Sequence, residues 1–224
     1  MKNIITNYND AYHALNASQF NFKCSINEPN NKAKGGTFYE IELTGFDGYQ
    51  FPHDLSNKLS SFVPHSTNKT NKLSDNKTPH ILGLDCDGIL LFEKSGKKYM
   101  LICELKSKPD KQDILKARKQ IVGSYIKMRA LMGTLSGIKI SEYIPIGLIV
   151  SFSPMPSTIN ALSKTIDEES TFLTVLFQKK YIHFTKKNLN QIFSPFETAD
   201  ISICYYGVSN NKVSDSVSIN TIIP

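Results

Sequence analysis

Two apolar segments joined by a short turn limit most strongly how this chain can fold. Residues 81–92 and 99–106 each have the length and apolar content of a strand. Residues 94–97 between them contain a glycine and are typical of a tight turn. The sequence therefore predicts a β-hairpin in the middle of the chain, with a polar stretch before it.

Charged residues are placed unusually on this predicted hairpin. If the turn is centred on residues 95–96, opposed residues have numbers that add to 191, which pairs Asp87 with Glu104 and Asp85 with Lys106. Opposed residues lie about 5 Å apart at Cβ, and alternate residues share a face. The pattern predicts two carboxylates and one ammonium group on one face. Asp85 competes with Asp87 for the same role, and the opposed register favours Asp87.

Such a group of charges has a clear use in phosphodiester chemistry. Two opposed carboxylates repel one another, and a divalent cation such as Mg²⁺ or Mn²⁺ would resolve the conflict through oxygen ligands. The ion would activate a water molecule and offset charge on a phosphate. Lys106, two residues after Glu104, would face the same water and phosphate.

The segments after the hairpin predict a layered α/β fold. Pro109 precedes a stretch, 110–132, whose apolar residues recur at helical spacing, and 144–152 is a further apolar strand. Hairpin, helix and strand in this order predict a mixed central sheet flanked by helices. The apolar residues expected on the inner face of the helix are Ile114, Ala117, Ile121, Tyr125, Met128 and Met132.

These motifs resemble the core of the PD-(D/E)XK nuclease superfamily over residues 80–152. The resemblance implies the αβββαβ core of restriction-endonuclease-like folds. Cys86 stands where the motif name has a proline, a position at which the family tolerates other residues. The resemblance rests on Asp87, Glu104, Leu105, Lys106 and Gln120.

The resemblance also implies roles for these residues. Asp87, Glu104 and the backbone carbonyl of Leu105 would bind Mg²⁺ or Mn²⁺. Lys106 would be the catalytic lysine, and Gln120 would support the metal water or a substrate phosphate, although an exposed helix residue is an equal alternative for it.

Further candidate residues lie outside the motif. Many family members have an additional acid on an earlier element, for which Glu40 and Glu42, on an expected strand over 37–43, are both candidates. The predicted helix is also basic, which fits either a solvated surface or contact with a nucleic-acid backbone. The basic residues of this helix are Lys111, Lys116, Arg118, Lys119 and Lys127, and the first four are the candidates for that contact.

The rest of the sequence is consistent with a single domain over 1–224. Residues 64–80 are polar and predict a mobile surface loop, and residues 153–224 are expected to complete the sheet or form a dimer surface. We expect no membrane segment and, without a signal-peptide pattern, a cytoplasmic location. Expected elements after residue 153 are a helix near 156–165 and strands near 171–177, 180–184 and 201–206.

The sequence thus predicts a metal-dependent nuclease acting on DNA. The net charge of +6 favours a polyanionic partner. The family makes a role in bacterial defence against foreign DNA reasonable, as a homodimer or with a partner protein. Two alternatives remain: a catalytically silent binding module of the same fold, in which a Lys106 salt bridge fills the site, and a nuclease acting on RNA.

Overall fold

The structure, a computed structural model, describes residues 17–28, 39–52, 84–134, 139–193, 197–209 and 212–223. Its centre is a seven-stranded mixed sheet with the strand order β1-β4-β5-β6-β7-β9-β8. The strands of this sheet, in chain order, are β1 (Ser18–Phe20), β4 (Gly48–Gln50), β5 (Gly88–Lys94), β6 (Lys97–Lys106), β7 (Tyr143–Phe152), β8 (Tyr181–Phe184) and β9 (Ile201–Val208).

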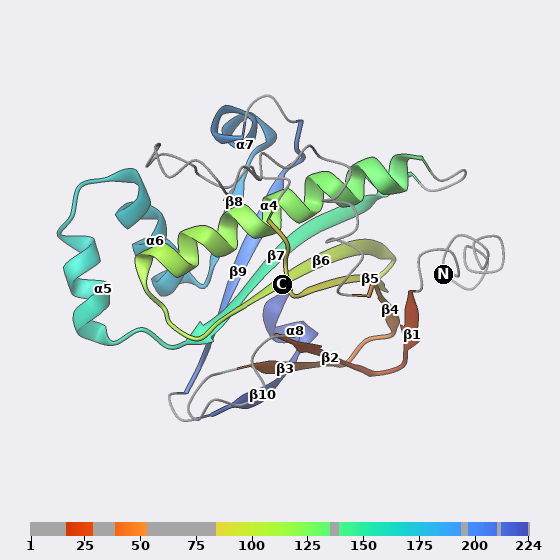
Figure 1. The fold of residues 1–224 in the computed structure, drawn as a ribbon, viewed down its shortest axis with the longest axis horizontal. Coiled ribbons are helices and arrows are strands. Elements are labelled where there is room, and N and C mark those ends of the chain that lie inside the picture. The colour runs from red at the N-terminus through yellow and green to blue at the C-terminus, as the bar shows by residue number, and fades with distance from the viewer. Residues whose placement is uncertain are drawn as a thin grey trace, which may run out of the picture.

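A second, smaller sheet has the order β10-β3-β2 and lies on the other side of the large sheet from the long helix α4 (Figure 1). Its strands are β2 (Lys23–Asn27), β3 (Glu40–Thr44) and β10 (Ser214–Ser218). The helices are α4 (Lys111–Gly133), α5 (Pro156–Ser163), α6 (Glu168–Lys179), α7 (Lys186–Ile192) and α8 (Ile219–Ile222), with a short 3₁₀ turn, η2 (Ile140–Glu142). The prediction of a mixed sheet flanked by helices is confirmed.

The predicted hairpin is present as β5 and β6, with the predicted register. Lys94 pairs with Lys97, and the ladder continues to Gly88 opposite Cys103, so that paired numbers add to 191 throughout. Ser95 and Gly96 have φ angles of 52° and 72°. Two consecutive residues with positive φ form the type of turn whose twist matches that of antiparallel strands, which explains why a glycine is needed here.

The helix α4 connects β6 to β7, which pair in parallel. Its first residue is Lys111, one later than expected, because the Asp110 side chain accepts a hydrogen bond of 2.8 Å from the Asp113 amide and caps the helix. All six apolar residues predicted for its inner face are buried. The helix ends at Gly133, one residue after the expected stretch.

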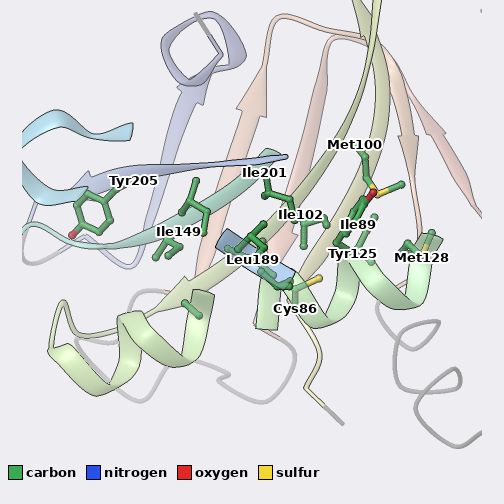
Figure 2. Packing of buried hydrophobic residues seen from close by; sticks show 14 of the residues in the cluster. Cys86, Ile89, Met100, Ile102, Tyr125, Met128, Ile149, Leu189, Ile201 and Tyr205 are labelled. Atoms are coloured by element: carbon green, nitrogen blue, oxygen red, sulfur yellow. The ribbon is translucent and has the colours of Figure 1, made fainter. Parts of the chain in front are cut away.

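Two hydrophobic cores lie on opposite faces of the large sheet. In the first, Ile89, Met100 and Ile102 pack against α4, α6 and α7 (Figure 2). In the second, side chains that alternate with these along β5 and β6, among them Leu90 and Leu101, pack against the small sheet and α8. Because both faces of the hairpin are covered, its strands read as continuous apolar runs in the sequence.

The C-terminal portion differs from the prediction in two places. Residues 171–177 belong to the helix α6 and not to a strand, because the Asp167 side chain accepts a 2.8 Å hydrogen bond from the Ser170 amide and starts a helix. The strand β10 pairs in parallel with β3, far away in the sequence, which was not predicted. The expected helix near 156–165 and strands near 180–184 and 201–206 are confirmed as α5, β8 and β9. The loop expected at 64–80 lies outside the described residues.

Candidate metal and nucleic-acid site

Asp87 lies where the hairpin opens, directly before the first residue of β5. Its amide donates a 3.0 Å hydrogen bond to the carbonyl of Cys103, and its Oδ2 accepts one of 2.7 Å from the amide of Leu105. The carboxylate therefore accepts the Leu105 hydrogen bond that a backbone carbonyl would accept if β5 began earlier. No hydrogen bond to the other oxygen, Oδ1, is found among the described residues. Asp87 is thus held next to β6 with one oxygen available.

Glu104 and Lys106 extend from β6 on the face that α4 covers, because they follow Met100 and Ile102 of the first core at two-residue spacing. Their side chains form an ion pair through Glu104 Oε1 and are 2% and 12% exposed, respectively. The second oxygen of Glu104, Oε2, is buried and has no hydrogen-bond partner of acceptable geometry. A buried carboxylate oxygen without a partner is costly, and this atom could accept a further ligand.

The two carboxyl groups share an environment that favours their neutral forms. Burial raises the pKa of Asp87 to about 6, against the effect of the Leu105 amide and Lys106, which lower it. Burial and, second, the charge of Asp87 raise the pKa of Glu104 to about 8, although Lys106 and the nearby Gln120 amide act in the opposite direction. The structure therefore brings Asp87, Glu104 and Lys106 together, as the sequence predicted, at an electrostatic cost.

Asp85 is not the competitor for Asp87 that the sequence suggested. Its carboxylate forms an ion pair with the buried Lys127 of α4, and its carbonyl accepts a 2.6 Å hydrogen bond from the Gln120 amide. Gln120 is buried, which excludes its reading as an exposed helix residue, and its Oε1 has no hydrogen-bond partner. The default interpretation of Lys127 as part of a solvated basic helix face is wrong, because Lys127 is buried. Its position seven residues after Gln120 places both residues on one side of α4.

Neither candidate for an additional acid reaches the site. Glu40 and Glu42 alternate along β3 with Ile41 and Leu43, whose side chains enter the second core, so the two carboxylates point away from it. Glu42 pairs instead with Lys23 over 3.1 Å.

The acid that does lie near Asp87 is Glu28, which follows β2 and raises the pKa of Asp87 by its charge. Its position is fixed by a 2.9 Å hydrogen bond from its amide to the Tyr39 carbonyl. Gly88 explains how β2 comes so close, since a Cβ at that residue would lie 2.9 Å from Ile26. The sequence offered no sign of Glu28, which precedes a Pro-Asn-Asn stretch read as a loop.

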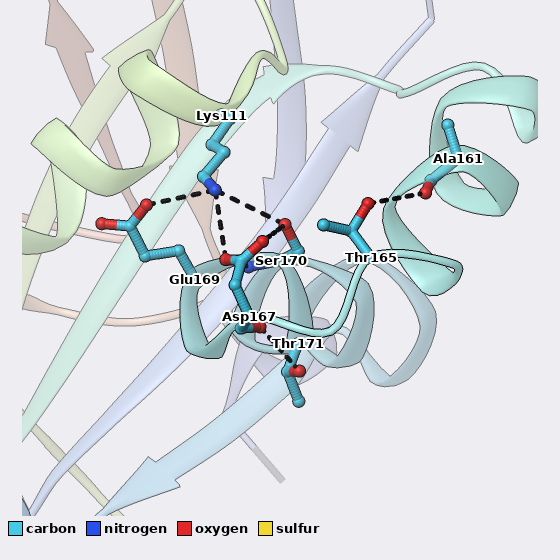
Figure 3. Close-up of polar contacts among 7 residues, drawn as sticks. All are labelled: Lys111, Ala161, Thr165, Asp167, Glu169, Ser170 and Thr171. Atoms are coloured by element: carbon cyan, nitrogen blue, oxygen red, sulfur yellow. Dashed lines mark hydrogen bonds and ion pairs between the residues drawn. The ribbon is translucent and has the colours of Figure 1, made fainter.

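The four basic residues considered for backbone contact have different surroundings. Lys111 is engaged by α6, with distances of 3.1 Å to Asp167 and 3.2 Å to Glu169 (Figure 3). Arg118 is buried with its guanidinium 4.7 Å from the centre of the Phe172 ring, so the expectation that it lies on a basic surface is wrong.

Lys116 and Lys119 remain as surface candidates. Both line a groove of about 600 Å³ whose other lining residues include Leu84 and Leu115. The charge of Lys116 lowers the pKa of Asp87, so Lys116 lies within electrostatic range of that carboxylate. These two lysines therefore give the site a positive side.

The donor set fits a hard divalent cation that keeps several waters. Within the described residues there is no group of three or more His, Cys, Asp or Glu side chains that could hold a metal ion. Asp87, the unpartnered Oε2 of Glu104 and the Leu105 carbonyl would supply three oxygens, and Mg²⁺ is commonly held by one or two carboxylates with water and phosphate. The Leu105 carbonyl is suitable because it points to the same side of β6 as its amide, which Asp87 binds.

Comparisons with known proteins add no relationship. No protein-family model, no curated protein and no solved structure matches this chain. No helix among the described residues is long and apolar enough to cross a membrane.

Proposed function

We propose that the chain is a metal-dependent nuclease of the PD-(D/E)XK class that hydrolyses phosphodiester bonds of DNA. The observation that carries this proposal is the buried Oε2 of Glu104, which lacks a partner beside Asp87 and Lys106. If the ion pair were purely structural, the second carboxyl group and the unsatisfied oxygen beside it would only lower the stability of the fold.

The arrangement of the central elements supports the same proposal. β4 pairs antiparallel with β5, β5 pairs antiparallel with β6, and α4 leads to β7, which is parallel to β6. This βββαβ succession agrees with the restriction-endonuclease-like core that the resemblance implies. Of the proposed ligands, Asp87 directly precedes the second of these strands, and Glu104 and Leu105 lie on the third.

Each residue of the site would have its own role in hydrolysis. A bound Mg²⁺ or Mn²⁺ ion would lower the pKa of a water molecule and offset phosphate charge. Asp87, Glu104 and the Leu105 carbonyl would hold the ion. Release of Glu104 from its ion pair would leave the Lys106 ammonium group free to orient the attacking water or stabilise the pentavalent phosphate.

Lys116 and Lys119 would bind the adjoining backbone phosphates. Both line the groove that also includes Leu84, three residues before Asp87. Lysine suits this contact, since it acts as a compact point charge.

Incubation of the purified protein with plasmid DNA and Mg²⁺ or Mn²⁺ tests this function. Wild-type protein should cut the DNA, and Asp87→Ala and Lys106→Ala should each reduce the rate by about a hundredfold or more. Lys98→Ala is the matched control, because Lys98 stands on the same strand and pairs with Glu142 on the surface. Parallel reactions with RNA identify the substrate, and cleavage of RNA alone would overturn the DNA assignment.

The ion pair between Lys106 and Glu104 favours one alternative, a nuclease-fold binding module without turnover. In that case Lys106 would permanently occupy the place of the cation. Titration calorimetry with Mn²⁺ distinguishes the two, because the nuclease must bind the ion and the silent module must not. If cleavage is found, a cytoplasmic role in defence against foreign DNA, as a homodimer or with a partner protein, would be the context to examine next.

A further inference from the structure

Three polar side chains lie along one side of α4 beneath the candidate site. Gln120, Ser124 and Lys127 are spaced by four and three residues, so they share one side of the helix. All three are buried, and Lys127 is only 5% exposed. Polar residues on a covered side of a helix need partners, and the partners here belong to one short segment.

That segment is residues 84–86, which lead directly into Asp87. The Gln120 amide donates to the Asp85 carbonyl over 2.6 Å, and the Cys86 amide donates to Ser124 Oγ over 3.1 Å. Lys127 Nζ donates to the Leu84 carbonyl over 2.9 Å and also pairs with the Asp85 carboxylate.

Segment 84–87 is therefore held by contacts on two sides, although it is not part of a paired strand. β5 begins only at Gly88, so regular pairing with β6 is absent before it. On one side α4 holds residues 84–86, and on the other side the Cys103 carbonyl and the Leu105 amide hold Asp87. Lys127 binds the segment twice, through its backbone and through its charge.

Burial of the Lys127 ammonium group lowers the stability of the fold. An ion pair only partly offsets the free energy of removing the charge from water, and an apolar side chain would pack without that cost. The ion pair with Asp85 gives a direction and a register that apolar contact does not. We propose that Lys127 is a positioning residue, which sets the segment 84–86 and thereby the place of the Asp87 carboxylate relative to Glu104.

Hydrogen exchange by mass spectrometry tests this positioning without reference to metal or activity. Lys127→Met should accelerate exchange about tenfold or more in peptides that cover 84–88, with the remainder of the chain unchanged. The reason is that Lys127 would no longer fix the segment that holds the Cys86 and Asp87 amides against their acceptors. Arg129→Met, on the same helix but paired with Glu197, should exchange as wild type over 84–88. The double variant Asp85→Asn, Lys127→Met also removes the carboxylate charge that Lys127 pairs with and should still show the faster exchange.

The consequence for the site depends on the proposed function and is measured separately. Mn²⁺ affinity should fall about tenfold in folded Lys127→Met and in the double variant, and remain unchanged in Arg129→Met. Wild-type exchange over 84–88 in both Lys127 variants, or acceleration spread evenly over the whole chain, would overturn the positioning role. If wild-type protein binds no Mn²⁺, the proposed function fails, while the exchange result still decides the role of Lys127.

Discussion

The two faces of the β5–β6 hairpin differ in what they bury. On the face toward the small sheet, the buried side chains, such as Leu90, Leu101 and Leu105, are apolar. On the face toward α4, apolar side chains fill the middle of the hairpin, and Asp87, Glu104 and Lys106 occupy the open end. The chain thus keeps one face for stability alone and places buried charge on the other, where β5 has not yet begun.

The largest effect is expected from breaking the apolar face. Leu101→Ala should lower the free energy of unfolding by about 2–5 kcal/mol, because Leu101 is fully buried in a central strand and the substitution leaves a cavity. Chemical denaturation in the absence of metal measures this. Lys98→Ala on the same strand, which loses only an exposed ion pair, should cost about 1 kcal/mol or less. Equal losses in both variants would contradict the contrast between the faces.

The opposite outcome is expected for the charged face. The folded pKa of Glu104, about 8, lies above the ordinary range of a glutamate, so the folded state binds a proton that the unfolded state has lost. Stability without metal should therefore be highest near pH 5 and decline as the pH rises toward 8. Glu104→Gln should remove most of this decline and raise the free energy of unfolding at pH 8 by on the order of 1 kcal/mol.

Denaturation midpoints at pH 5.5, 7 and 8.5 measure this pH dependence for both proteins. Glu142→Gln serves as the control, since Glu142 is an exposed acid whose pKa is lowered by the Lys98 hydrogen bond. A wild-type protein that becomes more stable from pH 5.5 to 8.5 would show that Lys106, and not burial, governs Glu104. Glu104→Gln should also weaken Mn²⁺ binding under the proposed function.

A smaller effect separates the charges of α4 that pack from those that face solvent. Under the proposed function, replacement of Lys116 and Lys119 by alanine should weaken DNA binding about five- to tenfold, because two phosphate contacts are lost. Arg118→Met should leave DNA binding unchanged, since this guanidinium is buried over Phe172. Fluorescence anisotropy with Ca²⁺ at two salt concentrations gives both affinities, and an equal loss in Arg118→Met would contradict its placement.

The smallest expected effect concerns the rim where the small sheet approaches the charged end. Glu28→Gln should change Mn²⁺ affinity by about threefold, the size of one screened charge interaction near a surface. Glu42→Gln is the matched control and should have no effect, because that side chain pairs with Lys23 away from the core. Calorimetry on both variants checks this, and equal responses would mean that Glu28 has no part in the site.

The local parts of the fold and of the site could be predicted from the sequence. The hairpin register followed from two apolar segments and one glycine, and it correctly brought Asp87 next to Glu104. The inner face of α4 followed from the spacing of its apolar residues. Both depend on contacts between neighbours in the chain, which periodicity reports directly.

The parts that failed depend on contacts that periodicity does not report. The segment 171–177 has the composition of a strand, yet the Asp167 cap and burial of Phe172 and Leu176 at helical spacing make it a helix. Glu28 reaches Asp87 only because Ile26 of β2 packs over Gly88, which is tertiary packing between distant segments. Lys127 was read as solvated because basic helices usually are.

The parallel pairing of β3 with β10 has a consequence for how the protein is made. Residues 40–44 leave the ribosome long before residues 214–218, so one edge of β3 stays unpaired while most of the chain is synthesised. An unpaired strand edge is open to association with other chains, and shielding by a chaperone would be most useful during this interval. The small sheet, whose Ile26 packs against Gly88, is therefore among the last parts of the molecule to be completed.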